Sequence, residues 1–173
     1  VVFEQGVPNK KLYRRFNIKN VLGQDDFASM EEVLSRRFRR WRASHEEPDH
    51  VGKKPDLAFS MLPDLLIVDG GKGQLSRAIK VLEDYNLIDR VPLAGLAKQE
   101  EELFVPGEHD SIYLERRSQG LYLVQRIRDE AHRFAITAHR KRRKNLGLAS
   151  RLDVIPGIGP TRRKALLQKF GSV

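Results

Sequence analysis

Cysteine is absent from the 173 residues, so disulfide bonds and metal sites with cysteine ligands are excluded. No apolar run approaches the ~20 residues that a transmembrane helix needs, and no secretory signal peptide is visible. The sequence begins at Val1 without a methionine and breaks off at Gly171–Val173 inside a motif, so we expect a fragment of a longer protein. The missing signal peptide is therefore only weak support for a cytoplasmic location.

Positive charge dominates the composition. Lysine and arginine together number 32 against 23 aspartate and glutamate residues, which gives a formal net charge of +9. This balance favours a polyanionic partner, most simply nucleic acid. The alternative is a soluble protein that is basic without binding such a partner.

Apolar spacing and turn residues predict an alternation of strands and helices. The segment 42–63 contains three prolines and no clean periodicity, so we expect an exposed, mobile insertion there. Because a hairpin precedes the strand–helix–strand crossovers, the expected class is α/β with a mixed sheet. The predicted elements are a hairpin with its turn at 6–10 and second strand at 11–18, a helix at 26–41, a strand at 65–68, a helix at 74–85, a strand at 91–96, a hairpin of 103–105 with 112–114, and a helix at 119–144 that stops near Gly147.

A short apolar run ends in Asp69, and three glycines and Lys72 follow it before a helical pattern begins. Four apolar residues without polar alternation are typical of a strand buried on both faces, which would put Asp69 at a sheet edge. Glycines there would let backbone amides approach a bound anion. Two interpretations stay open: Asp69 takes part in metal or phosphate chemistry, or it caps the helix. A P-loop is excluded, because Gly73 replaces the required Ser or Thr and the first glycine is absent.

The long helix carries Arg128 and His132 one turn apart, on one face. Histidine titrates near neutral pH and suits proton transfer. A carboxylate at a strand end and such a histidine are the catalytic groups that metal-assisted phosphodiester hydrolysis uses. The alternative is a DNA-binding module without catalysis, in which Asp69 is a helix cap and His132 a core residue.

The last segment, from Leu152 to Val173, has the pattern of two short helices around a compact turn. Glycines in that turn would leave amides exposed at a helix start and form a phosphate nest, which reads backbone and not bases. The alternative is an ordinary helical hairpin. The residues expected to contact DNA here are Gly157, Ile158, Gly159, Arg162 and Lys164.

Five motifs, in this order, make the sequence resemble the UvrC family, the nuclease subunits of the bacterial UvrABC excision-repair system. They are Tyr13–Phe16, Leu66–Gln74, Gly95–Lys98, Arg128–Ala135 and Pro156–Gly159. The resemblance runs over nearly the whole chain and corresponds to the C-terminal half of that family.

The resemblance implies an RNase H-like endonuclease domain over 1–147 and the first, truncated helix–hairpin–helix motif of a DNA-binding domain over 148–173. It further implies incision of damaged double-stranded DNA on the 5′ side of a lesion, in a complex with UvrB and with UvrA upstream in the pathway. A divalent metal ion, Mg²⁺ or Mn²⁺, is the implied cofactor. No membrane partner is expected.

For the site, the resemblance implies that Asp69 is the second catalytic Asp and a metal ligand, that His132 is the catalytic histidine, and that Lys98 lies near them. Lys72, Arg128 and Arg133 are expected to contact DNA. The first catalytic Asp of the family lies on a first strand, in a Phe-Asp-Ile-Ser segment, which would precede Val1. We therefore expect these 173 residues to lack that strand and to be inactive by themselves. A second hairpin copy would follow Phe170.

Overall fold

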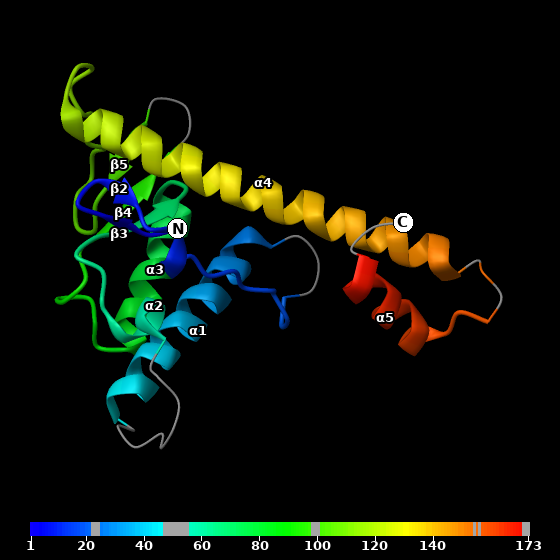
Figure 1. The fold of residues 1–173 in the computed structure, drawn as a ribbon. Coiled ribbons are helices and arrows are strands. Elements are labelled where there is room, and N and C mark those ends of the chain that lie inside the picture. The colour runs from blue at the N-terminus through cyan, green and yellow to red at the C-terminus, as the bar shows by residue number, and fades with distance from the viewer. Residues whose placement is uncertain (22–24, 47–55, 98–100, 154, 156, 171–173) are drawn as a thin grey trace. The chain divides into compact units, whose positions relative to one another are not determined.

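The computed structural model describes residues 1–21, 25–46, 56–97, 101–153, 155 and 157–170. These residues form two compact units, Val1–Arg128 and Asp129–Val173, which are described separately. The first unit contains every strand of the described residues, and the second contains most of the long helix α4 (Gln119–Asp153) and all of α5 (Pro160–Phe170). Figure 1 shows the order of the elements along the chain.

A short antiparallel hairpin opens the first unit, with β1 (Phe3–Glu4) paired to β2 (Val7–Pro8). Gln5 and Gly6 both have positive φ, which a two-residue hairpin turn requires. The prediction of a hairpin is confirmed, but the predicted turn at 6–10 and second strand at 11–18 are wrong.

The 3₁₀ helix η1 (Lys10–Leu12) replaces the start of that predicted strand. It forms because the side chain of Asn9 accepts a hydrogen bond from the backbone amide of Lys11, at 3.2 Å, and so favours a helical turn over an extended chain. Farther on, Phe16 packs edge-on against Phe59, with ring centres 6.1 Å apart. The alternating apolar residues therefore reflect side-chain packing and not strand pairing.

Helix α1 (Asp26–Glu46) confirms the predicted helix and continues five residues beyond its expected end. Asp25 fixes the start, because its Oδ1 accepts the backbone amide of Ala28 at 2.9 Å and satisfies a donor that no helical carbonyl reaches. Leu34 and Phe38 bury the inner face of the helix.

The central sheet has three strands in the order β3 (Leu66–Asp69), β4 (Leu93–Leu96), β5 (Leu103–Phe104). β3 and β4 are parallel, whereas β4 and β5 are antiparallel, so the prediction of a mixed sheet is confirmed. A bridge from Leu103 to Ile112 forms the return of the second predicted hairpin.

Helix α3 (Lys72–Asp84) packs against the sheet and against α1, and the core of the first unit lies among these elements (Figure 1). Leu82 is fully buried, so its truncation to Ala would cost about 2–5 kcal/mol. The core residues are Leu34, Phe38, Val68, Leu75, Ala78, Val81, Leu82, Leu87, Val91 and Leu93.

Part of the predicted insertion at 42–63 is ordered structure. Helix α2 (Leu57–Ser60) buries Ala58 and Phe59, and the carboxylate of Asp56 caps it by accepting the Ala58 amide at 3.1 Å. The prediction of an exposed, mobile segment is wrong here, because one aromatic side chain is enough to attach a single turn to the domain. The stretch 47–55 lies outside the described residues.

The long helix α4 passes through Gly147, where the sequence predicted a stop, and ends at Asp153. A single glycine costs a helix only about 1 kcal/mol, and no proline lies between Gly147 and Pro156 to end the helix earlier. The first of the two predicted short helices is therefore the end of α4, and α5 is the second. None of the described helices is long and apolar enough to cross a membrane.

Candidate functional site

Asp69 is the last residue of β3, and its side chain is exposed although the preceding Val68 is buried. It lies opposite Leu96 at the carboxyl end of the parallel pair, and the next amide, that of Gly70, donates to the Leu96 carbonyl at 2.9 Å. The carboxyl ends of parallel strands are the usual place for catalytic and phosphate-binding groups. The expected burial of this strand on both faces is wrong, because β3 is an outer strand of the described sheet and only Val68 among its residues is buried. The strand presents one carboxylate to solvent at its carboxyl end.

The turn after Asp69 rests directly on the neighbouring strand. Gly70 has a φ of 151°, which favours glycine, and a Cβ added at Gly95 would lie 2.8 Å from the Gly70 carbonyl oxygen. Only a residue without a side chain lets the two backbones approach this closely. No role was expected for Gly95 beyond its place in a motif, although a glycine within an apolar strand is a known signal of close backbone contact.

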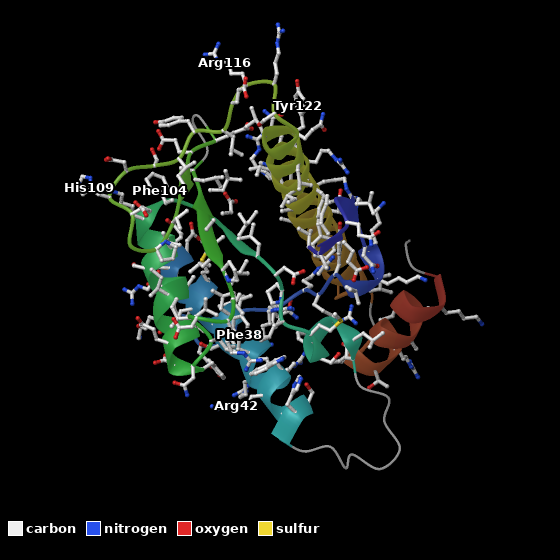
Figure 2. The ribbon with its side chains drawn as sticks, turned by 90° about the vertical axis from the view of Figure 1, so that its left-hand side faces the viewer. Phe38, Arg42, Phe104, His109, Arg116 and Tyr122 are labelled. Atoms are coloured by element: carbon white, nitrogen blue, oxygen red, sulfur yellow. The ribbon has the colours of Figure 1, made fainter. Side chains whose placement is uncertain are left out.

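Helix α3 begins immediately after this turn, and Gly71 is its N-cap, without a side-chain hydrogen bond. The interpretation of Asp69 as the cap of this helix is therefore wrong. Lys72, in the first turn, donates from Nζ to the carbonyl oxygen of His109 at 2.8 Å and lies 5.8 Å from the ring centre of Phe104. Figure 2 labels both of these partners, on the β5 side of the domain.

The start of α4 is held to the first unit by a polar cluster. Glu101 accepts hydrogen bonds from Gln125, at 2.6 Å, and from Arg128, at 2.5 Å. Glu101 has a positive φ of 58°, and its side chain is only 13% exposed. The sequence showed an acidic run at this point but no feature that pairs it with α4. Arg128 remains a predicted DNA contact, and in this structure its guanidinium binds a carboxylate.

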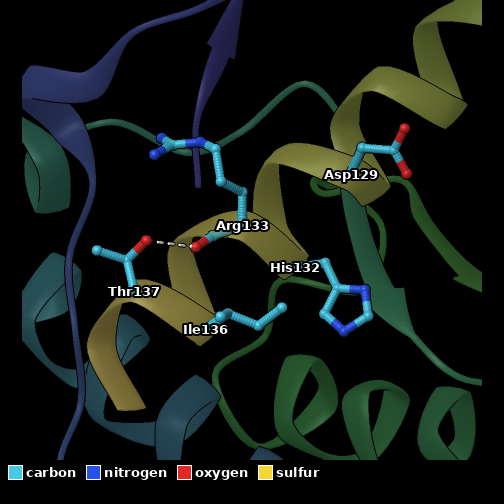
Figure 3. A pocket seen from close by; sticks show the side chains of 5 residues that line it. All are labelled: Asp129, His132, Arg133, Ile136 and Thr137. Atoms are coloured by element: carbon cyan, nitrogen blue, oxygen red, sulfur yellow. Dashed lines mark hydrogen bonds between the residues drawn. The ribbon is translucent and has the colours of Figure 1, made fainter. Parts of the chain in front are cut away.

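His132 lies in the second unit and is exposed on α4. With Asp129 and three further residues, it lines an open hollow of about 400 Å³ (Figure 3). Figure 3 shows Asp129 and His132 on one side of the helix, while Arg133 and Thr137 turn to the other. Arg133 forms two hydrogen bonds with Glu130, at 2.5 and 2.6 Å. The guanidinium of Arg133, which the sequence predicts to contact DNA, is therefore also bound to a carboxylate in this structure.

The hairpin between α4 and α5 contains Gly157 with a φ of 85°. Arg162 donates to the Gly157 carbonyl oxygen at 3.0 Å, and the amide of Ile158 donates to the Ile155 carbonyl at 3.2 Å. The Ile158 amide is thus used inside the turn, whereas a Cβ at Gly159 would meet open space. Val154, Pro156 and the side chain of Lys164 lie outside the described residues.

Comparison with known sequences decides the family. The profile of the UvrC RNase H endonuclease domain matches residues 1–136. The chain belongs to the UvrC family. UvrABC system protein C of Methanosphaera stadtmanae is 49% identical over 173 residues, and that of Thermobifida fusca is 48% identical over 188 residues. Each alignment covers all of this chain but only 28% of the relative's length.

For a UvrC RNase H endonuclease domain, the two predicted catalytic residues fall in different units, Asp69 in the first and His132 in the second. Each is exposed, so each is accessible to substrate. Among the described residues, no group of three or more His, Asp or Glu side chains is arranged to hold a metal ion. Lys98, the remaining residue that the family resemblance implied, lies outside the described residues.

Proposed function

We propose that this chain is the endonuclease and first DNA-binding part of an excision-repair subunit that incises damaged double-stranded DNA on the 5′ side of a lesion. The observation that carries the proposal is the exposed Asp69 at the carboxyl end of the parallel strand β3, within a domain of the UvrC family. In this proposal 1–147 performs hydrolysis, and 148–173 begins the DNA-binding domain.

The proposed cofactor is Mg²⁺ or Mn²⁺, because an exposed carboxylate is a ligand that hard divalent cations prefer. Asp69 would supply one oxygen ligand. The described residues do not complete a donor set around it, so they fit a metal site only in part. A divalent cation, when bound, supplies charge stabilisation at the phosphoryl oxygens.

His132 is the proposed proton-handling residue. Its exposed imidazole is suited to hold or accept a proton from the attacking water near neutral pH.

The hairpin around Gly157 is the proposed contact to the phosphate backbone, with Arg162 and Lys164 as the basic groups beside it. Lys72, Arg128 and Arg133 are proposed to reach DNA by exchanging their present carbonyl or carboxylate partners for phosphate. UvrB is the proposed protein partner, and UvrA would act before it. All of these contacts are to backbone, so lesion choice would rest with the partners.

The test is an incision assay with a full-length protein that contains this chain, reconstituted with UvrA and UvrB on a lesion duplex. We expect Asp69→Asn to lower the incision rate by at least about 10³-fold at every Mg²⁺ or Mn²⁺ concentration. The matched control is Asp89→Asn, which removes an exposed carboxylate of the same unit outside the site. Equal rates for both variants would favour the alternative of a purely DNA-binding module.

A further inference from the structure

Three guanidinium groups lie around one aromatic ring of the first unit, that of Phe59, which is itself buried. The ring of Phe59 lies 4.7 Å from the guanidinium carbon of Arg40, 5.9 Å from that of Arg14 and 6.0 Å from that of Arg37. These residues come from three separate segments, before α1, in α1 and in α2. We call Arg14, Arg37 and Arg40 the arginine cluster. Contacts of this kind attract a guanidinium group to the aromatic ring and restrict its movement.

The arginine cluster carries more positive charge than its surroundings compensate. Asp56 pairs with Arg14, with a hydrogen bond from Nε to Oδ2 at 2.9 Å. The hydrogen bonds from Arg14 lower the pKa of Asp56, and the charge of Arg40 lowers it further. Within the part of the chain that the structure describes, neither Arg37 nor Arg40 forms an ion pair of its own. The carboxylate of Asp56 thus interacts with Arg14 and Arg40, while Arg37 donates to a backbone carbonyl.

Arg37 is the group for which this imbalance costs most. Its guanidinium is partly buried and donates to the carbonyl oxygen of Ala58 at 3.0 Å, a neutral acceptor. Burial lowers the pKa of Arg37, which means that the charged form is destabilised by lost hydration. An anionic oxygen at this position would relieve the cost.

Helix geometry accounts for only part of this arrangement. Arginines near the C-terminus of α1 are favoured by the helix dipole, and their stems can cover apolar surface. Neither effect requires three guanidinium groups on one ring with a single counter-charge. Arg36, by comparison, is paired with Glu32 at 2.8 Å. Arg39 and Arg40 remain exposed beside it.

We propose that the arginine cluster binds the phosphate backbone of the DNA substrate, as a contact of the endonuclease unit that is separate from the hairpin at Gly157. The guanidinium fork matches a pair of phosphate oxygens, and the aromatic ring restricts the movement of the guanidinium groups that would bind such a pair. The contact would be independent of base sequence. This inference rests on the proposed function, which makes DNA the polyanion.

The experiment measures the affinity of the full 173-residue chain for a fluorescein-labelled 20-bp duplex by fluorescence anisotropy over a range of salt concentrations. We expect Arg37→Gln/Arg40→Gln to bind about tenfold more weakly and to flatten the slope of log K against log salt by about 1.8, for two lost phosphate contacts. The matched control, Arg77→Gln/Lys80→Gln, removes two cations that already pair with Glu31. It should leave both values unchanged.

Because Arg37 is partly buried and bonds to the Ala58 carbonyl, the exposed Arg40 is also replaced alone. Arg40→Gln should show half the slope change, and circular dichroism checks its fold. In addition, the duplex should protect Arg40 of the unaltered chain from phenylglyoxal, as read by mass spectrometry. Equal slopes for the cluster and control variants, without protection of Arg40, would overturn the inference. So would protection of Arg40 from phenylglyoxal by a polyglutamate peptide but not by the duplex. Loss of incision in Asp69→Asn is independent of these results, so the two proposals fail separately.

Discussion

Replacement of Gly95 by alanine should disturb the support under Asp69 without touching Asp69 itself. The added Cβ would lie 2.8 Å from the Gly70 carbonyl oxygen, which is 0.6 Å short of the 3.4 Å at which ordinary contact begins. The opposing atom belongs to the backbone, so no side-chain rotation relieves the clash. The β-carbon of Leu75, 3.4 Å from the added atom, limits movement in a second direction.

The expected cost is that of inserting one carbon into a packed interior, about 1–3 kcal/mol in the free energy of unfolding. With a urea dependence near 2 kcal/mol per molar, the midpoint of urea unfolding should fall by about 1 M. Incision on the 5′ side by the full-length protein should fall further, by up to about 10²-fold, if the turn moves and displaces the carboxylate by about 1 Å.

Gly120→Ala is the control for Gly95→Ala. Gly120 lies in the first turn of α4, where the nearest atom to an added Cβ is 3.8 Å away, so this variant should be neutral or slightly stabilised. If Gly95→Ala and Gly120→Ala unfold at the same urea concentration, the close packing of the turn on β4 does not stabilise the domain, and the reasoning is refuted.

Three further predictions concern pH, DNA binding and catalysis. The hydrogen bond from the Asn20 amide lowers the pKa of Glu32 most, and Arg36 lowers it as well. The charged Glu32 side chain therefore stabilises the fold above pH 4.5, its ordinary pKa. This stabilisation is lost as the pH falls through the lowered pKa. The stability difference between the unaltered chain and Glu32→Gln, measured by urea unfolding, should therefore shrink below about pH 4.5; a constant difference would count against this. Gly157→Asp should weaken duplex binding for all sequences alike and flatten its salt dependence, whereas an unchanged salt slope would argue against a phosphate contact at the hairpin. Finally, the 173-residue chain with Mg²⁺ or Mn²⁺ should not cut a lesion duplex, because the described residues supply an incomplete ligand set, and cleavage that Asp69→Ala abolishes would contradict this.

Local patterns in the sequence predicted the elements that position Asp69. The apolar run before Asp69 predicted a strand, although β3 is less buried than expected, and the glycines mark the turn into α3. The helix predicted to begin at residue 26 likewise begins there, behind the capping carboxylate of Asp25. These features succeed because each depends on neighbours in the sequence.

The errors arise where packing between distant segments decides the structure. Phe16 alternates as in a strand, but its ring contacts Phe59. The turn of α2 forms because Phe59 is buried, within a segment whose prolines suggest a loop. Gly147 looks like a helix stop and is too weak to be one.

The candidate site was predicted as a set of residues but not as a set of contacts. The pairing of Glu101 with Arg128 and the approach of Gly95 to Gly70 join segments that are far apart in the sequence, and no local pattern indicates them. The same holds for the arginine cluster, whose members are separated by up to 26 positions, from Arg14 to Arg40.

The central claim is that Asp69 serves the 5′ incision. Its most direct test is a duplex with a single lesion, labelled at both ends of the damaged strand, incubated with UvrA, UvrB and the full-length Asp69→Asn protein. The account predicts that 5′ incision disappears while any cut on the 3′ side of the lesion persists, because Asp69 is proposed to serve the 5′ incision alone. Incision on the 5′ side at the rate of the unaltered protein would contradict it.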